Sequence, residues 1–129
     1  MLKAFPSCSS DWKEMNTLGK EGEDIAADFL KKKGFRIIEK NYRTVFGEID
    51  IIAQDHGVIV FVEVKTRAGI AFGYPFEAVN PKKREKIKKT AFCFMKKLKK
   101  EVPARFDVLS IHFEQGRQQI EHIQDAFEV

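Results

Sequence analysis

The residues whose types and spacing could carry chemistry are Asp50, Glu63 and Lys65. Asp50 lies in residues 48–54, and the other two lie in residues 58–66; both segments are rich in Ile or Val, which predicts β-strands. Successive side chains of a strand point to opposite faces, so Glu63 and Lys65 share one face. If the two strands pair as a hairpin, either of two registers places Asp50 on that face, opposite Glu63 or diagonal to it.

Two carboxylates so near each other, on strands otherwise built from apolar residues, destabilise the fold. They repel each other, and burial removes them from water. A divalent cation would offset that cost, and Mg²⁺, or Mn²⁺ in its place, prefers oxygen ligands. We therefore expect Asp50 and Glu63 to bind a metal, with the backbone carbonyl of Val64 as a further ligand. Lys65 would orient or help deprotonate a water molecule at the cation and neutralise charge developing on a phosphate. The alternative from spacing alone is a cross-strand salt bridge between Lys65 and one carboxylate, without catalysis.

Other elements must hold these two strands in place. A 3.6-residue period of apolar and small side chains predicts a helix over about residues 17–33, ending before Gly34. Asn80-Pro81 is typical of the start of a second helix. The predicted order is αβββαββ, an α/β (α+β) fold in which a crossover connection joins two strands of a mixed sheet and helices pack on its faces. The predicted strands are residues 35–43, 48–54, 58–66, 105–113 and 118–123.

Residues 66–80 form a long irregular stretch between the third strand and the second helix. Loops of this length inside compact domains tend to be functional, so we expect the stretch to border the site. Its aromatic side chains could stack on unpaired bases or simply fold the loop over the core. They are Phe72, Tyr74 and Phe76.

Positive charge is concentrated in the second predicted helix. The whole chain has a net charge of +4, yet residues 82–100 carry ten Lys or Arg and one acid, Glu85. Such a segment, in a chain whose other residues are net acidic, predicts a surface that grips a polyanion. A solvated helix face is the alternative. The residues of this segment expected to bind nucleic acid are Lys82, Lys83, Arg84 and Lys86.

Other classes of site are disfavoured. Cys8 and Cys93 lack C-x-x-C spacing, and the three His form no pair at metal-ligand spacing, which argues against zinc. The sequence has no apolar signal region and no apolar run long enough to span a bilayer, so we expect a cytoplasmic protein without a membrane partner. The length favours one domain, over residues 17–129, after a poorly ordered leader of residues 1–16.

A set of short motifs runs in one order from Leu18 to Phe127. They are Gly22-Glu23-Asp24 with Ala26, Asn41-Tyr42-Arg43, Gly47-Glu48-Ile49-Asp50, Phe61-Val62-Glu63-Val64-Lys65-Thr66-Arg67, Ala78-Val79 with Lys82, Arg105-Phe106-Asp107-Val108 and Ala126-Phe127. Together they resemble the YraN family of largely uncharacterised bacterial proteins. That family is similar to the archaeal Holliday-junction resolvases and to the PD-(D/E)xK nucleases. The Pro-Asp that names this superfamily is Ile49-Asp50 here.

The resemblance implies a restriction-endonuclease-like three-layer fold and a Mg²⁺-dependent endonuclease that hydrolyses phosphodiester bonds in DNA. Branched, Holliday-junction-like DNA is one substrate class that it implies. Resolvase-like proteins act as dimers because a junction has two-fold symmetry, so the resemblance also implies a homodimer. The alternative is a non-catalytic nucleic-acid-binding protein of the same fold.

The resemblance also implies roles for individual residues. Arg43 and Arg67 would flank the phosphates of the substrate. The implied catalytic residues are Asp50, Glu63, Lys65 and, from the first helix, Glu23. Outside this set, we interpret Glu48 as an exposed residue at a strand start, with a helper role at the metal ligands as the alternative. We interpret Asp107, beside Arg105, as a structural partner.

Overall fold

The computed structural model describes residues 10–68 and 81–127, with side chains described from residue 21 onward. Its elements follow the order αβββαββ that the sequence predicts. The helices are α1 (Ser10–Lys32) and α2 (Pro81–Lys97), and the strands are β1 (Arg36–Thr44), β2 (Gly47–Asp55), β3 (Val58–Ala68), β4 (Ala104–Glu114) and β5 (Arg117–Phe127). None of the described helices is long and apolar enough to cross a membrane.

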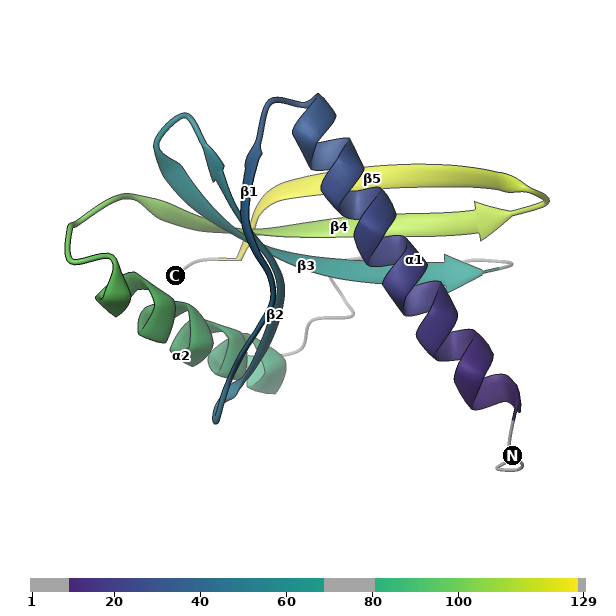
Figure 1. The fold of residues 1–129 in the computed structure, drawn as a ribbon, viewed down its shortest axis with the longest axis horizontal. Helices are drawn as coiled ribbons and strands as arrows, with labels where there is room; N and C mark the ends of the chain where they lie inside the picture. Colours follow the sequence, from purple (N-terminus) through teal and green to yellow (C-terminus); the bar gives the residue numbers. More distant parts are fainter. Residues whose placement is uncertain (1–9, 69–80, 128–129) are drawn as a thin grey trace.

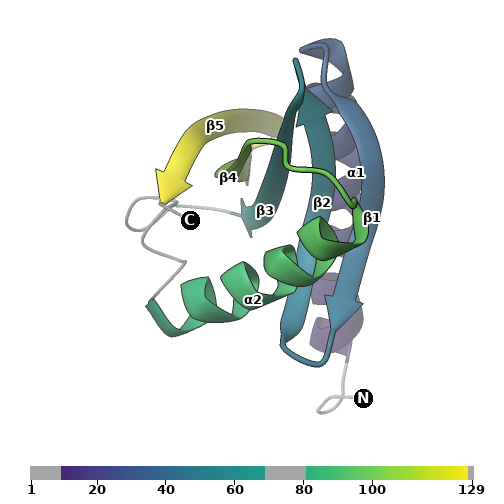
Figure 2. The same cartoon turned by 90° about the vertical axis from the view of Figure 1, so that its left-hand side faces the viewer.

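The strands form one sheet in the order β1-β2-β3-β4-β5. β3 and β4 pair in parallel, and the other neighbours pair antiparallel. α2 is the crossover that parallel neighbours need. The sheet twists strongly, with α1 on one face and α2 on the other, so the molecule has three layers (Figures 1 and 2). The mixed sheet with flanking helices that the sequence predicts is therefore confirmed.

Each face of the sheet has its own core because β-strand side chains alternate. Under α1, Leu30 packs with Val60, Val62 and neighbouring aliphatic residues. Under α2, Phe94 packs with Phe61 and neighbouring aromatic and aliphatic residues. β3 thus supplies buried residues to the cores on both faces of the sheet.

Several bounds differ from the sequence prediction. α1 begins at Ser10 rather than near residue 17, β3 continues to Ala68, and β5 continues to Phe127 rather than residue 123. The extension of β5 depends on tertiary contacts: the Phe127 ring stacks on Phe106 with centroids 4.8 Å apart. Residues 69–80, with Phe72, Tyr74 and Phe76, and residues 1–9 lie outside the described part of the chain.

The turn between β2 and β3 fixes the register of the site. His56 and Gly57 both have positive φ (50° and 85°), as a two-residue hairpin turn requires. Asp55 pairs with Val58, and this register continues to Ile51 opposite Val62. Continued by one position, this register would set Asp50 opposite Glu63, which is the side-by-side arrangement of the two expected registers, although the last paired residues are Ile51 and Val62.

Candidate active site

β2 and β3 stop pairing where the two carboxylates begin. Their last paired residues are Ile51 and Val62, although both strands continue beyond this point. The Val64 N–H donates to Asp50 Oδ2 at 2.8 Å, so a side chain accepts the hydrogen bond that a neighbouring strand would otherwise accept. Asp50 and Glu63 therefore lie where β2 and β3 are no longer hydrogen-bonded to each other.

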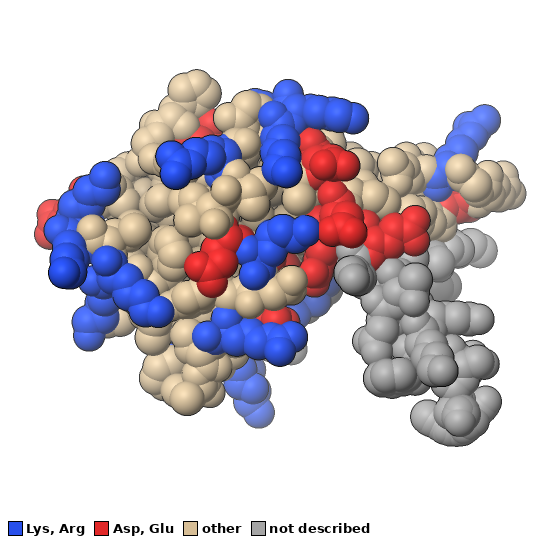
Figure 3. Space-filling view, in the orientation of Figure 1, with Lys and Arg blue, Asp and Glu red and all other residues tan. Residues whose placement is uncertain are grey.

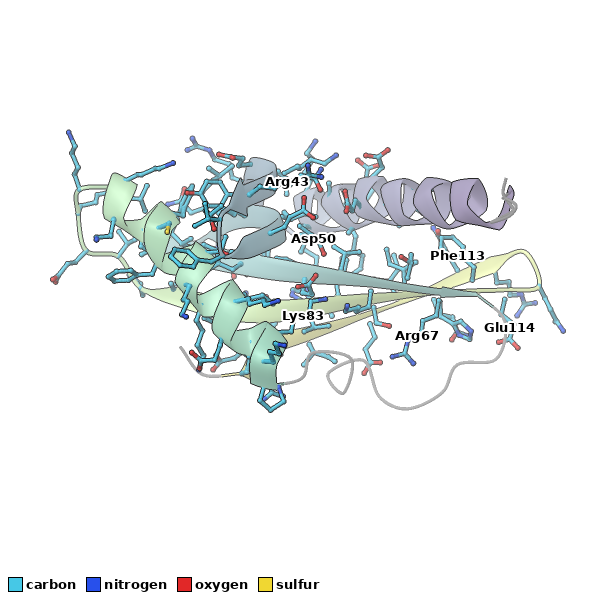
Figure 4. All side chains as sticks on the ribbon, turned by 90° about the horizontal axis from the view of Figure 1, so that it is seen from below. Arg43, Asp50, Arg67, Lys83, Phe113 and Glu114 are labelled. Atoms are coloured by element: carbon cyan, nitrogen blue, oxygen red, sulfur yellow. The ribbon has the colours of Figure 1, made fainter. Side chains whose placement is uncertain are left out.

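A cleft of about 330 Å³ lies at this position. Residues from α1, β2, β3 and α2 line it, so every layer of the fold contributes. In Figure 4, Asp50 and Lys83 project into the space between α1 and α2. The charged residues that line the cleft are Glu23, Glu48, Asp50, Glu63, Lys83 and Lys86.

The two central carboxyl groups are under electrostatic strain. Burial, followed by interaction with the Glu63 carboxyl group and its charge, raises the pKa of Asp50 to about 8. Glu63 is only 8% exposed, and its Oε2 is buried without a hydrogen-bond partner. Its Oε1 faces Lys83 Nζ at 3.7 Å, which is long for a charge-assisted hydrogen bond. The raised pKa of Asp50 shows that two negative charges on these neighbouring carboxyl groups disfavour each other.

Lys65 is half-buried beside the same carboxylates. Burial and the nearby ammonium group of Lys83 lower the pKa of Lys65, against the opposing charges of Glu63 and Asp50. A lysine with a lowered pKa can exchange a proton more readily near neutral pH than an exposed lysine. The structure thus brings together the three residues on which the sequence prediction rests.

Glu23 reaches the cleft from α1. Partial burial and the charge of Asp50 raise its pKa, which indicates that it belongs to the same electrostatic cluster. Glu48, which the sequence interpretation treats as an exposed strand-start residue, also lines the cleft. The Nε of Arg43 donates to Glu48 Oε2 at 2.6 Å, so Arg43 contacts the rim of the site. The alternation that groups Glu48 with Asp50 on β2 was the signal that could have identified it.

The basic residues predicted to bind nucleic acid are not equivalent. Lys83 and Lys86 line the cleft, and Lys82 is exposed at the start of α2. Arg84 instead lies over the Phe127 ring, 5.4 Å from its centroid, on the C-terminal side of the fold. Arg67 lies farther along β3 than the cleft residues (Figure 4). Figure 3 shows carboxylates gathered between α1 and the β1–β2 hairpin, with basic side chains around them and over α2.

Asp107 provides a contrast within the same sheet. It is fully buried and accepts hydrogen bonds from Arg105 Nε at 3.0 Å and from the backbone N–H of Asp125 at 3.0 Å, and it lies 2.7 Å from His122 Nε2. Burial alone would raise its pKa, but the hydrogen bonds from His122 and Arg105 hold it below its usual value. Asp107 is thus a fully paired structural carboxylate, in agreement with its interpretation from the sequence.

The cleft carboxylates fit a divalent cation that takes only one or two of its ligands from protein side chains. Among the residues that the structure describes, no three His, Cys, Asp or Glu side chains converge closely enough to hold a metal ion by themselves. Mg²⁺ commonly takes one or two carboxylates and keeps water and substrate oxygens as its other ligands. Asp50 with the unpartnered Oε2 of Glu63 meets that smaller requirement.

A family model described as an uncharacterised protein family, UPF0102, matches residues 22–111. The chain belongs to this family. The resemblance to the YraN family is thereby confirmed. The matched UPF0102 segment runs from α1 into β4 and includes Glu23, Asp50, Glu63 and Lys65.

Similar UPF0102 proteins come from several bacteria. One from Thermodesulfovibrio yellowstonii is 53% identical over 110 residues, which cover 85% of this chain and 95% of the relative. Another from Persephonella marina is 47% identical, with 86% of this chain and 93% of the relative covered. A third from Syntrophomonas wolfei is 46% identical, with 85% and 96% covered. The match therefore spans nearly the whole of these UPF0102 proteins.

Proposed function

We propose that the protein is a metal-dependent endonuclease that hydrolyses phosphodiester bonds in DNA. The proposal rests on the state of two neighbouring carboxyl groups. Asp50 has a pKa raised to about 8, and the buried Oε2 of Glu63 has no hydrogen-bond partner. A structural ion pair has the opposite effect, as the lowered pKa of Asp107 illustrates. An acidic pair kept unsatisfied beside lysines is typical of a functional site.

Asp50, Glu63 and the backbone carbonyl of Val64 would hold the cation. Mg²⁺, or Mn²⁺ in its place, would supply the Lewis acidity that activates water for attack on a phosphodiester. Lys65, with its lowered pKa, would orient the attacking water and neutralise charge on the phosphate. Glu23 would hold a proton or a water molecule on the α1 side of the cleft.

The basic side chains around the cleft would bind the phosphates of the substrate. Lys83 and Lys86 are nearest the carboxylates, because both line the cleft. Arg43, Arg67 and Lys82 would contact phosphates farther from the scissile bond. The similarity of the family to resolvases adds branched DNA as a substrate class and a homodimer as the active form. Sedimentation velocity tests the second point; a monomer at all concentrations would remove it.

A cleavage assay tests the proposal. Purified protein is incubated with branched, nicked, single-stranded and duplex DNA in Mg²⁺ or in EDTA. We expect cleavage only with the metal, and a loss of at least about 100-fold in Asp50→Ala and in Lys65→Ala. The matched control is Asp28→Asn, which changes an exposed carboxylate of α1 and should leave the rate unchanged. Equal rates in all four proteins would indicate a contaminating nuclease and refute the proposal.

A non-catalytic nucleic-acid-binding protein of this fold is the second candidate function. The observation that favours it is the basic surface of α2, which needs no metal to attract a polyanion. This alternative predicts salt-sensitive DNA binding that survives Asp50→Ala, without cleavage in any metal. Binding would weaken when Lys82, Lys83 and Arg84 are neutralised. A protein that cleaves in Mg²⁺ excludes it.

A further inference from the structure

A second concave surface lies between the β1–β2 turn and α2. It encloses about 450 Å³ and is lined by Phe46, Lys88, Lys89, Phe92, Cys93 and Lys96. Phe92 is 62% exposed and Phe46 is 43% exposed. Val45, in the same turn, is 95% exposed. We call the six residues that line this concavity the aromatic groove; Val45 is not among them.

The apolar residues of the aromatic groove do not belong to the core. α2 packs on the sheet through Ile87, Ala91 and Phe94, which are all buried. Phe92 lies off that stripe and directs a large ring into solvent. Exposed rings gathered in one concavity are typical of a surface that binds something.

Lysines accompany both rings of the groove. Lys89 Nζ lies 5.8 Å from the centroid of Phe46, and Lys96 Nζ lies 5.1 Å from the centroid of Phe92. Lys88 is partly engaged, because its Nζ is 4.0 Å from Glu85 Oε1. Among the residues that line this groove none is acidic. An occupant must therefore offer flat apolar faces together with negative charge.

We propose that the aromatic groove binds an unpaired nucleic-acid strand. Bases would stack on Phe46 and Phe92, and phosphates would lie near Lys89 and Lys96. A strand of nucleic acid alternates the two features that the groove combines, because every base has a π-face and every linkage carries a charge. A purely apolar partner would have to bury the lysine ammonium groups, which is unfavourable without counter-charges.

Residues of the aromatic groove are neighbours of cleft residues, both in the sequence and along α2. Phe46 precedes Gly47, which lines the cleft, and Lys86 lines the cleft one helical turn before Lys89. A strand that leaves the cleft could thus pass onto the groove. This inference rests on the proposed function and narrows its substrate to DNA with a single-stranded segment beside the cutting site.

Fluorescence anisotropy with two labelled DNAs tests the inference. One is an oligothymidylate and the other a fully paired duplex of the same length, both titrated with full-length protein in EDTA so that cleavage has no effect. We expect Phe92→Ala to weaken oligothymidylate binding about tenfold and duplex binding less than about twofold. Phe92→Trp keeps a stacking ring and should retain the affinity. Val45→Ala removes exposed apolar surface without a ring and serves as the matched control.

The remaining outcomes overturn the inference. Equal weakening of both DNAs by Phe92→Ala, or unchanged binding of both, would show that the ring does not stack on bases. A change in the sedimentation coefficient of the free protein on Phe92→Ala would assign the groove to a contact between two copies of the chain. Wild-type protein that does not bind oligothymidylate in EDTA would refute the inference alone, because the proposed function is tested separately by cleavage in Mg²⁺.

Discussion

Replacement of Asp50 by Asn should stabilise the protein in a pH-dependent way. The folded structure raises the pKa of Asp50 from its ordinary 3.8 to about 8, chiefly through burial and then through Glu63. A carboxyl group with a raised pKa favours folding fully at pH values below its ordinary pKa. That contribution is lost as the pH rises from about 4 to about 8, because the unfolded chain ionises first. Asn cannot ionise, yet its side-chain oxygen can still accept the Val64 N–H.

The size of the effect follows from the pKa. At about 1.4 kcal/mol per tenfold change in the dissociation constant, a rise from 3.8 to about 8 corresponds to about 6 kcal/mol. Water in the open cleft screens the charges, so we expect about half of this, ~3 kcal/mol, as the gain in unfolding free energy of Asp50→Asn at pH 8.5. At pH 4.5 the gain should be below about 1 kcal/mol.

Urea unfolding followed by circular dichroism measures this gain at steps between these two pH values in EDTA. Asp28→Asn is the matched control, because Asp28 is exposed on α1. Addition of Mg²⁺ at pH 8.5 should stabilise the wild type and close the gap, since a ligand that binds only the folded state raises its stability. A gain that does not change with pH, or an Asp50→Asn protein less stable than wild type at pH 8.5, would show that the fold does not raise the pKa of Asp50.

Three further predictions concern other contacts. Gly22→Ala should destabilise the protein by about 2 kcal/mol in thermal denaturation, because the new Cβ would overlap Thr66 Cγ2, and Thr66→Ser in the same chain should restore part of the loss. Asp107→Asn should lower the free energy of unfolding in urea by about 3 kcal/mol at pH 7. Because the pKa of Asp107 is held below its usual value, this loss should shrink as the pH falls below about 4. A loss independent of pH would contradict this prediction. Lys83→Gln should weaken DNA binding and lower the slope of log affinity against log salt by about one, and an unchanged slope would mean that Lys83 serves Glu63 rather than the substrate.

The sequence predicts the central pair because β-strands impose a strict alternation. Once β2 and β3 are recognised as a hairpin, Asp50 and Glu63 fall on the same face in either expected register, because the alternation of side chains fixes which positions share a face. The same alternation places Glu48 in the cleft. Glu48 lies at the rim of the cleft with its side chain 36% exposed, so it is partly solvated, as expected of a charged residue at a strand start, and also faces the site.

Features that depend on tertiary contacts could not be predicted in this way. The end of β5 follows from stacking of Phe127 on Phe106, and nothing in the local sequence indicates that contact. Arg84 belongs to the basic run, yet the helical rotation of α2 turns it toward Phe127 and away from the cleft. The aromatic groove joins Phe46 to Phe92, which lie in different elements and have no shared sequence period.

We propose that Asp50 and Glu63 form one divalent-cation site. Crystals grown with Mn²⁺ and analysed by anomalous scattering test it most directly, because Mn²⁺ takes the oxygen ligands that Mg²⁺ prefers. We expect an anomalous peak between the two carboxylates that is absent in Asp50→Asn and retained in Asp28→Asn. Clear density for both side chains without a peak, or a peak that persists unchanged in Asp50→Asn, would contradict it.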